Sequence, residues 1–326
     1  MKQRFVLVGH GAIARTYLEA MGHLASCRIV GVVGRHAVRV QKFAEKHGIP
    51  CSGTKLAEVA TASGANAVIV CTPNGIHEEG VMAAADLGLH VLCEKPLHID
   101  PVRQRAMVKR CEQRGVVLGV AYIRRFTPHL LWIKALMEAG KLGRVTVADI
   151  SLKHYRDPAY YEDDWHGTRA IDGGGPFMQQ GIHLIDMVQW LCGGWDKVIS
   201  AACFTLHHDI EVEDHGYAVV RYRNGAVGSI AASTACVGMS SERLEISGTF
   251  GSVSADFGGL LELDVPGVEI PEFRTPSIEY NILFQQLLID FNQAIEKGRA
   301  PVVTGASGSR ATELVHEIYR AADRMK

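Results

Sequence analysis

The chain lacks the features that suit a membrane or a polyanionic partner. No apolar stretch approaches the about 20 residues that a membrane-spanning helix requires, and the apolar run at residues 5–8 is too short for the core of a signal peptide. Lysine and arginine number 34 and aspartate and glutamate 35, which gives a net charge of −1 without a run of one sign. We therefore expect a cytoplasmic protein that binds neither nucleic acid nor a membrane.

Cysteine pairs of the form C-x-x-C are also absent. Several of the eight cysteines fall within apolar strand patterns. This distribution favours reduced, buried thiols over disulfides or zinc ligands, and we predict no metal site. The cysteines are Cys27, Cys51, Cys71, Cys93, Cys111, Cys192, Cys203 and Cys236.

Length and patterning predict two domains of different class. The chain has 326 residues, more than one hydrophobic core usually serves, with 47% hydrophobic and 21% charged residues. Strand and helix patterns alternate up to about residue 122, which predicts a Rossmann dinucleotide-binding domain over residues 1–122, a doubly wound parallel sheet of the α/β class. Residues 123–326 predict an α+β domain on an open, mostly antiparallel sheet, which binds substrate and forms oligomers.

A dinucleotide motif follows the first predicted strand, residues 4–8. Its sequence, residues 9–14, has the form G-x-G-x-x-A and leads into a predicted helix around residues 16–21. Gly9 would permit the tight turn, Gly11 would let the backbone approach a pyrophosphate, and Ala14 would allow close packing of the helix.

The end of the next predicted strand, residues 28–33, indicates which cofactor is bound. NAD enzymes usually carry Asp or Glu there for the adenosine ribose, whereas this chain has Gly34-Arg35-His36. Arg35 could offer a planar, charge-assisted fork to a 2′-phosphate, so NADP(H) is favoured over NAD(H). Arg35 could instead stack on the adenine, which would leave the choice of cofactor open.

Later strands of this domain also end in candidate residues. Asn74 and His77 follow the strand at residues 67–71 as cofactor-edge candidates, although a turn and a first helical turn explain them equally well. Lys95 follows the buried strand at residues 89–93, where open α/β sheets bind ligands, and Pro96 holds it extended. A surface lysine beside a turn is the alternative. A helix starting at Asp100-Pro101 and a strand at residues 116–120 complete the domain.

The second half is dominated by strand patterns. Asn224-Gly225 between two alternating segments is a strong hairpin signal, and an uncovered sheet face would favour a homo-oligomer, a dimer or a tetramer. The predicted strands are residues 145–155, 217–222, 226–232, 243–247 and 252–257, and the predicted helices are residues 128–139 and 306–325.

One predicted helix, residues 177–190, carries a second chemical signal. Glycines 173–175 and Pro176 precede it and mark a start where backbone can approach a ligand. Gln179, His183 and Asp186 would share one helix face, so His183 would need only a facing ammonium to form an acid/base site. A structural hydrogen bond between His183 and Gln179 or Asp186 is the alternative.

These motifs together resemble the glucose-fructose oxidoreductase, inositol dehydrogenase and rhizopine-catabolism (Gfo/Idh/MocA) family. The resemblance rests on residues 9–14, on Cys71-Thr72-Pro73-Asn74 with His77, on Glu94-Lys95-Pro96, and on the run from Gly173 to Asp186. It extends through residues 246–252 and Asp290-Phe291 over nearly the whole chain. It implies NAD(P)-dependent oxidation or reduction of sugars, polyols and nucleotide sugars.

The resemblance also implies the roles of individual residues. His183 would move the hydroxyl proton, Lys95 would stabilise the developing charge on the same oxygen, and Gln179 would orient the substrate or His183. The implied cofactor contacts are Gly9, Gly11, Ala12, Ile13, Arg35, Thr72, Asn74, His77, Glu94 and Lys95. The substrate contacts are expected among Arg124, Arg125, Tyr155, Arg156, Tyr160, Trp165, Arg169, Asp172, Gln179 and His183. For each of the arginines, the aromatic residues and Asp172, a packing or surface role is the alternative.

Gln179 departs from the family, which often has Asp or Asn four residues before this histidine. Glutamine carries no charge, so it can act only through its amide, and we expect a less basic His183. Arginines beside aromatic side chains suit a sugar with an anionic or nucleotide substituent. His166 stands where many members have Arg in a Trp-Arg-Gly-Thr signature.

Three functions fit the sequence. The favoured one is hydride transfer between nicotinamide and a secondary alcohol or ketone of a carbohydrate-like substrate. The second is hydrolysis or epimerisation of a sugar through its transient oxidation by tightly bound cofactor. The third is a dinucleotide-sensing regulator without turnover, which the presence of both Lys95 and His183 disfavours.

Overall fold

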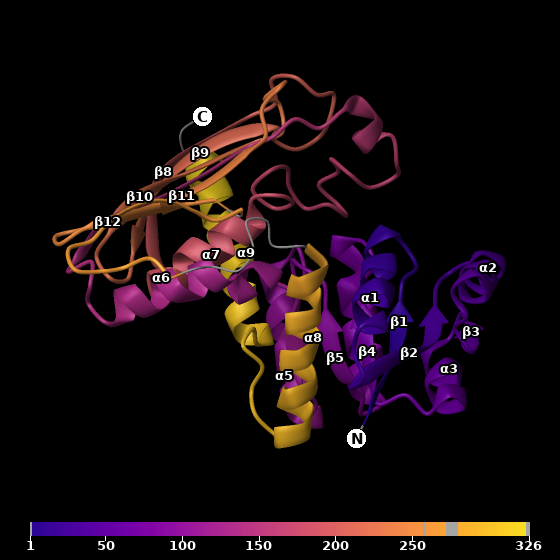
Figure 1. The fold of residues 1–326 in the computed structure, drawn as a ribbon. Coiled ribbons are helices and arrows are strands. Elements are labelled where there is room, and N and C mark those ends of the chain that lie inside the picture. Colours follow the sequence, from indigo (N-terminus) through magenta and orange to yellow (C-terminus); the bar gives the residue numbers. More distant parts are fainter. Residues whose placement is uncertain (1, 257, 272–279, 324–326) are drawn as a thin grey trace. The chain divides into compact units, whose positions relative to one another are not determined.

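The computed structural model describes residues 2–256, 258–271 and 280–323, which form two compact units (Figure 1). The first unit comprises the described residues within 1–123 and 279–309. The second comprises those within 124–278 and 310–326.

The first unit contains a six-stranded parallel sheet in the order β3-β2-β1-β4-β5-β6. This is the order of a doubly wound dinucleotide-binding fold, so the predicted Rossmann architecture is confirmed. β4 and β5 are almost fully buried, which explains their continuous apolar sequences. The strands are β1 (Gln3–Val8), β2 (Cys27–Val33), β3 (Cys51–Gly53), β4 (Ala67–Val70), β5 (His90–Cys93) and β6 (Leu118–Val120).

Local sequence signals fix the helices of this unit. Asp100 caps α5, because its side chain accepts the N–H of Val102 at 2.7 Å, and Gly115 ends the helix with φ 63°. The helices are α1 (Ala12–Gly22), α2 (Ala37–His47), α3 (Leu56–Ser63), η1 (Asn74–Ile76), α4 (His77–Asp86) and α5 (Pro101–Arg114).

A helix from far along the chain also belongs to the first unit. α8 (Tyr280–Lys297) packs against α1, where the rings of Phe284 and Tyr17 lie 5.0 Å apart, and Phe291 lies 6.1 Å from Phe5. Residues 280–297 fall within the segment that the sequence assigned to the second domain. Aromatic burial against α1 and β1 places them in the first unit.

The second unit contains a seven-stranded sheet in the order β13-β12-β11-β7-β10-β9-β8. All neighbouring strands pair antiparallel except β7 and β10, so the sheet is mostly antiparallel, as predicted. The Asn224-Gly225 turn joins β9 and β10 as the sequence indicated. The strands are β7 (Val145–Lys153), β8 (Trp195–Phe204), β9 (His215–Tyr222), β10 (Val227–Ser233), β11 (Ser241–Gly248), β12 (Ser252–Ala255) and β13 (Leu260–Asp264).

Helices cover one face of this sheet. Figure 1 shows α6 (Pro128–Glu138) and α7 (Ile182–Leu191) along that face. The remaining elements are η2 (Ile123–Phe126), η3 (Pro158–Tyr161) and α9 (Gly305–Asp323). Side chains of β9 alternate strictly, with Ala218 and Val220 buried and Tyr217 and Val219 exposed at 48% and 36%, so the other face bears apolar side chains in contact with solvent.

Some boundaries differ from the predicted ones. The predicted strand 252–257 ends at Ala255, and its last position lies outside the described residues, as do the last positions of the predicted helix 306–325. All eight cysteines are free thiols. Among the described helices, none combines the length and apolarity needed to cross a bilayer.

Candidate active site

Three neighbouring strands of the first unit end at the predicted cofactor residues. β1, β4 and β5 are adjacent and parallel, so the loops that carry Gly9, Thr72 and Lys95 leave the same edge of the sheet. Gly9 has φ +105°, and a Cβ there would lie 2.7 Å from the carbonyl oxygen of Cys71. Only glycine fits this turn.

The geometry at the start of α1 fits a dinucleotide. Gly11 is the N-cap residue, and a Cβ built on it meets no atom within 4 Å, so open space adjoins the helix end. No side chain caps the helix and its first turn holds no acidic residue, so the N–H groups at Ala12 and Ile13 are suited to a pyrophosphate. On the neighbouring loop the buried Oγ1 of Thr72 has no hydrogen-bond partner within the described chain.

The end of β2 explains the missing carboxylate. A Cβ on Gly34 would lie 2.7 Å from Nδ1 of His10, so the imidazole occupies the space that a side chain at position 34 needs. Arg35 is exposed directly after it, and Arg39 follows in the first turn of α2. Burial lowers the pKa of His10, and the positive charge of Arg39 lowers it further, so this edge of the unit is electropositive.

Hydrogen bonds to the buried Glu94 carboxylate fix the Glu94-Lys95-Pro96 segment. The buried Glu94 accepts a hydrogen bond from the Tyr17 hydroxyl at 2.8 Å and one from the backbone N–H of Lys95 at 3.1 Å. Burial raises the pKa of Glu94, while the charge of Lys95 and the Tyr17 bond oppose that rise. Lys95 itself is half-buried. Glu94 thus joins α1 to the lysine loop, and both its oxygens accept bonds from the protein.

His77 has a different place from the one expected. Its side chain is fully buried, with Nε2 at 2.8 Å from the carbonyl oxygen of Thr72 and Nδ1 at 2.9 Å from that of Pro96. Burial lowers its pKa to about 4, so the ring is neutral at pH 7. His98 makes a similar link, with Nε2 at 3.0 Å from the carbonyl oxygen of Gly75. The neutral ring of His77 has one N–H and donates to one of its carbonyl oxygens at a time. Both nitrogens of His77 therefore face backbone oxygens of the protein, while Asn74 is 5% exposed.

In the second unit, α7 begins later than predicted. The helix starts at Ile182, and residues 176–181 form turns in which the N–H of Gly181 reaches back five residues to Pro176 at 2.7 Å. This wide turn interrupts the helical period, so Gln179 does not share a regular helix face with His183. His183 lies half-buried in the first turn of α7.

Asp186 and Arg125 form a buried ion pair. Both carboxylate oxygens accept from the guanidinium, at 2.6 and 2.7 Å, and the side chains are 1% and 3% exposed. Arg125 also lies over the ring of Trp190. Arg125 was expected to contact substrate, and Asp186 was expected to flank His183. In the structure the two side chains instead pair with each other in the interior of the second unit.

Gln179 is held by a carboxylate that the sequence placed among the substrate contacts. Its amide nitrogen donates to Oδ1 of Asp172, which is 1% exposed, and Oδ2 of Asp172 accepts the N–H of Gly167 at 2.8 Å. A carboxylate therefore stands one hydrogen bond away from position 179, on Asp172.

The glycines before this segment serve close packing. A Cβ on Gly175 would lie 1.6 Å from the Glu213 carbonyl oxygen, and one on Gly174 would lie 2.0 Å from the Tyr319 hydroxyl. The buried Glu213 carboxylate accepts the N–H groups of Gly175 and Phe177 at 3.0 and 3.3 Å, and the hydroxyl of Tyr319 at 2.9 Å. The predicted approach of a ligand to this backbone is thus not supported, since protein atoms fill the space.

The remaining predicted substrate residues separate into two groups. Arg169 is exposed and donates to the backbone carbonyl oxygen of Glu211 at 2.9 Å. Tyr155, Arg156 and Trp165 belong to a half-buried cluster with Tyr160, Tyr161, His166 and His208, whose rings contact one another.

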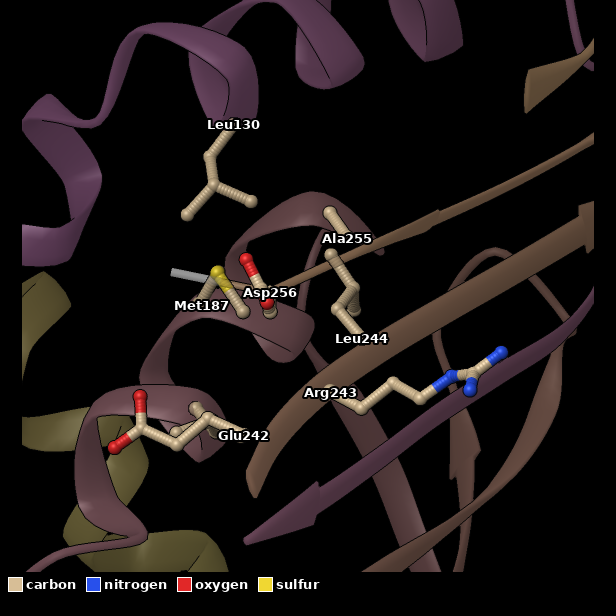
Figure 2. A pocket seen from close by; sticks show the side chains of 8 residues that line it. Leu130, Met187, Glu242, Arg243, Leu244, Ala255 and Asp256 are labelled. Carbon is tan, nitrogen blue, oxygen red and sulfur yellow. The ribbon is translucent and has the colours of Figure 1, made fainter. Parts of the chain in front are cut away.

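A small space between α6, α7 and the sheet is a packing feature. In Figure 2 the side chains of Leu130, Met187 and Leu244 converge, while the guanidinium of Arg243 points away from them. The space has no room for a water molecule, so it cannot hold a substrate.

Sequence reasoning missed several residues that hold the site. Tyr17 contacts Glu94, which is 77 positions away, and Tyr319 contacts Glu213, which is 106 positions away. No local sequence pattern reveals such contacts. His10 was visible, because it stands inside the glycine motif, but its contact with Gly34 required the structure.

Comparison with known proteins agrees with this geometry. A model of the oxidoreductase family with an NAD-binding Rossmann fold matches residues 3–122, and a model of the GFO/IDH/MocA C-terminal domain matches residues 130–254. Inositol 2-dehydrogenase of Rhizobium meliloti is 26% identical, over 98% of this chain and 97% of its own. D-xylose 1-dehydrogenase (NADP(+)) 2 of Haloferax volcanii is 28% identical, over 90% and 89%.

A solved structure is similar over the whole chain. The WlbA dehydrogenase from Bordetella pertussis, in complex with NADH and UDP-GlcNAcA, has a TM-score of 0.93 and 26% identity, covering 100% of this chain and 96% of its own. Sequence models, relatives and fold agree, and the chain belongs to the GFO/IDH/MocA family of NAD-binding oxidoreductases.

Proposed function

We propose that the chain transfers hydride between NADP(H) and a secondary alcohol or ketone of a sugar, polyol or nucleotide sugar. Full-length relatives named for inositol and D-xylose support the substrate class, as does a structure with bound UDP-GlcNAcA. The observation that carries the proposal is the open cradle at Gly9 and Gly11, which leads into an uncapped helix on the same sheet edge as Lys95.

We assign different steps of the reaction to His183 and Lys95. Bound nicotinamide would supply the hydride acceptor or donor. His183 takes the proton from the substrate hydroxyl as general base, a role suited to an imidazole near pH 7. Lys95 stabilises the negative charge that develops on the same oxygen. In the reducing direction, His183 returns the proton.

Gln179 orients the substrate or His183 through its amide. Its amide nitrogen donates to Oδ1 of the buried Asp172. Because Asp172 is buried and hydrogen-bonded, it fixes the rotamer of Gln179, so the amide is preorganised for this task.

The preference for NADP(H) rests on the end of β2. Gly34 offers no carboxylate to a ribose, and Arg35 and Arg39 supply positive charge for a 2′-phosphate. The test is a comparison of kcat/KM for NADP and NAD in the wild type and in Arg35→Ala. We expect the variant to lose affinity for NADP by about tenfold or more and to keep its affinity for NAD. Equal weakening of both cofactors contradicts this preference.

The reaction itself is tested with a panel of sugars, polyols and nucleotide sugars. Growth or loss of reduced-nicotinamide absorbance at a steady rate supports hydride transfer. Conversion of substrate without a net absorbance change would support transient oxidation by held cofactor, and no conversion at all would support a sensor.

The exposed sheet face supports a homo-oligomer. Val147, Val219 and Val227 on neighbouring strands are 39%, 36% and 39% exposed, with Tyr217 beside them at 48%. Light scattering of the wild type and of Val219→Lys tests this, and we expect the variant to dissociate. The free thiols fit a reducing cytoplasm.

A further inference from the structure

We infer that Arg156 binds an anionic group of the substrate, so that the preferred substrate is an acidic sugar. This inference rests on the proposed function and narrows it to one class of carbohydrate. It follows from four features of Arg156 within the second unit: its charge balance, its fixed backbone, its aromatic support and its link to the segment before His183.

Arg156 is a half-buried cation without a counter-ion. Within the described chain no carboxylate forms an ion pair with it, and its buried Nε has no hydrogen-bond acceptor. Most arginines at such depth are paired, as Arg125 is with Asp186. An unsatisfied guanidinium nitrogen is costly, and an incoming oxyanion would satisfy it.

The nearby carboxylates are already engaged. Glu242 lies close enough for the charge of Arg156 to lower its pKa, but its oxygens contact Arg124 at 3.4 Å and His154 at 3.5 Å. Asp172 accepts bonds from Gln179 and Gly167. The positive charge of Arg156 therefore remains available for a ligand.

The backbone on both sides of this side chain is fixed. The N–H of Arg156 donates to the carbonyl oxygen of Thr234 at 2.9 Å, and the carbonyl oxygen of Arg156 lies 2.8 Å from Nε2 of His208. The guanidinium lies 5.1 Å from the centre of the Tyr160 ring, a cation–π contact that limits its rotamers. Such support preorganises a planar fork for a carboxylate.

Tyr160 connects Arg156 to the segment that precedes His183. Its hydroxyl accepts the amide N–H of Gln180 at 3.4 Å. Burial raises its pKa, and the charge of Asp172 raises it further, which places Asp172 near the same ring. Arg156 is thus linked through Tyr160 to Gln180, three positions before His183, and on the proposed function a sugar at His183 would extend its anionic substituent towards Arg156.

A matched panel of sugars tests the inference. Glucose and galactose are compared with glucuronate and galacturonate, each free and as the UDP derivative, so that a carboxylate and a diphosphate are distinguished as sources of charge. Variants are Arg156→Gln and Arg156→Lys. Arg144→Gln, an exposed arginine before the other end of β7, is the matched control.

We expect the wild type to use or bind an acidic member better than its neutral match. Arg156→Gln should raise KM for the acidic member by about 10- to 100-fold and should change kcat/KM for the neutral match by a much smaller factor, and Arg156→Lys should recover part of the loss. The control should change neither. A preference that depends on UDP alone would identify the diphosphate as the bound anion.

Other outcomes overturn the inference. Equal use of acidic and neutral sugars, or an equal loss for both in Arg156→Gln, removes the anion role of Arg156 and leaves the proposed function intact. If no member of the panel is oxidised, the proposed function fails on this panel. The inference about Arg156 is then tested by the thermal unfolding temperature of the protein with each sugar. Absence of any stabilisation by glucuronate or galacturonate contradicts the inference.

Discussion

The imidazole of His10 occupies the space that a side chain on Gly34 would fill. Nδ1 of His10 lies 2.7 Å from an ideal Cβ at position 34, and a methyl group of Val40 lies 2.8 Å from it. We expect Gly34→Asp to lower the free energy of unfolding by about 1–3 kcal/mol, because the new side chain overpacks this corner. Urea unfolding measures the change.

The same pair predicts a change of cofactor. In the double variant His10→Ala/Gly34→Asp, the carboxylate has room to meet a ribose, so stability should recover. The ratio of kcat/KM for NADP to that for NAD should fall about tenfold or more. A double variant as unstable as Gly34→Asp alone would show that Val40, and not His10, sets the limit.

Lys95→Ala should remove turnover while cofactor still binds. We expect kcat to fall by about 10²-fold or more, because the proposed role of the ammonium is to stabilise the substrate oxygen in the transition state. The dissociation constant for NADPH, followed by its fluorescence, should change little. Full turnover in this variant would exclude Lys95 from the chemistry, and Lys55→Ala, an exposed lysine paired with Glu58, serves as the control.

The Asp172–Gln179 pair predicts that a carboxylate at position 179 is harmful here. Gln179→Glu would place a second carboxyl beside the buried Asp172, and mutual repulsion would raise the pKa of one of them. The variant should therefore be less stable than wild type at pH 7 and regain stability as pH falls. The double variant Asp172→Asn/Gln179→Glu restores a single charge and should recover at pH 7; a Gln179→Glu variant of unchanged stability and kcat would contradict this reading.

Arg125→Ala should destabilise the second unit. Removing the guanidinium leaves the carboxylate of Asp186 buried without its partner, which costs about 3–5 kcal/mol. The double variant Arg125→Met/Asp186→Leu should recover much of this loss in thermal unfolding. An increase in KM with unchanged stability would instead restore Arg125 as a substrate contact.

His77 predicts a pH dependence of stability. Its pKa is about 4 in the folded chain against 6.5 for the ordinary group, so the unfolded state binds the extra proton between these values. Its stabilisation is present above pH 6.5 and is lost as pH falls towards 4, by an amount on the order of 3 kcal/mol. Urea unfolding at pH 7 and pH 5 should show a smaller difference in His77→Gln than in wild type. Equal differences would contradict this assignment.

Much of the fold follows from local patterns. The strands β1, β2, β4 and β5 lie within a residue of their expected positions, because buried parallel strands have continuous apolar sequences. The Asn224-Gly225 hairpin and the cap at Asp100 have their own signals. β8 has no such local signal, because its partly exposed residues do not alternate between apolar and polar. The packing of α8 against α1 has none either, because tertiary contacts decide which element a helix packs against.

The site was predictable by residue type and less so by contact. The glycine motif has the conformation that its sequence requires, with Gly9 at φ +105°. The roles of His77, Asp172 and Arg125 depend on partners distant in sequence or on a turn that interrupts the helix, so spacing alone pointed to ligands where the structure has hydrogen bonds within the protein.

The contact of Tyr319 with Glu213 and Gly174 sets an order of events during synthesis. The segment before His183 packs against a tyrosine that emerges from the ribosome about 145 positions after Gly174. Until Tyr319 has been made, the Glu213 carboxylate, which accepts the N–H groups of Gly175 and Phe177, lacks the hydroxyl group that donates to it. A ribosome-bound fragment that ends at residue 309 would therefore contain the whole sequence of the first unit but would lack the tyrosine that packs against the segment before His183.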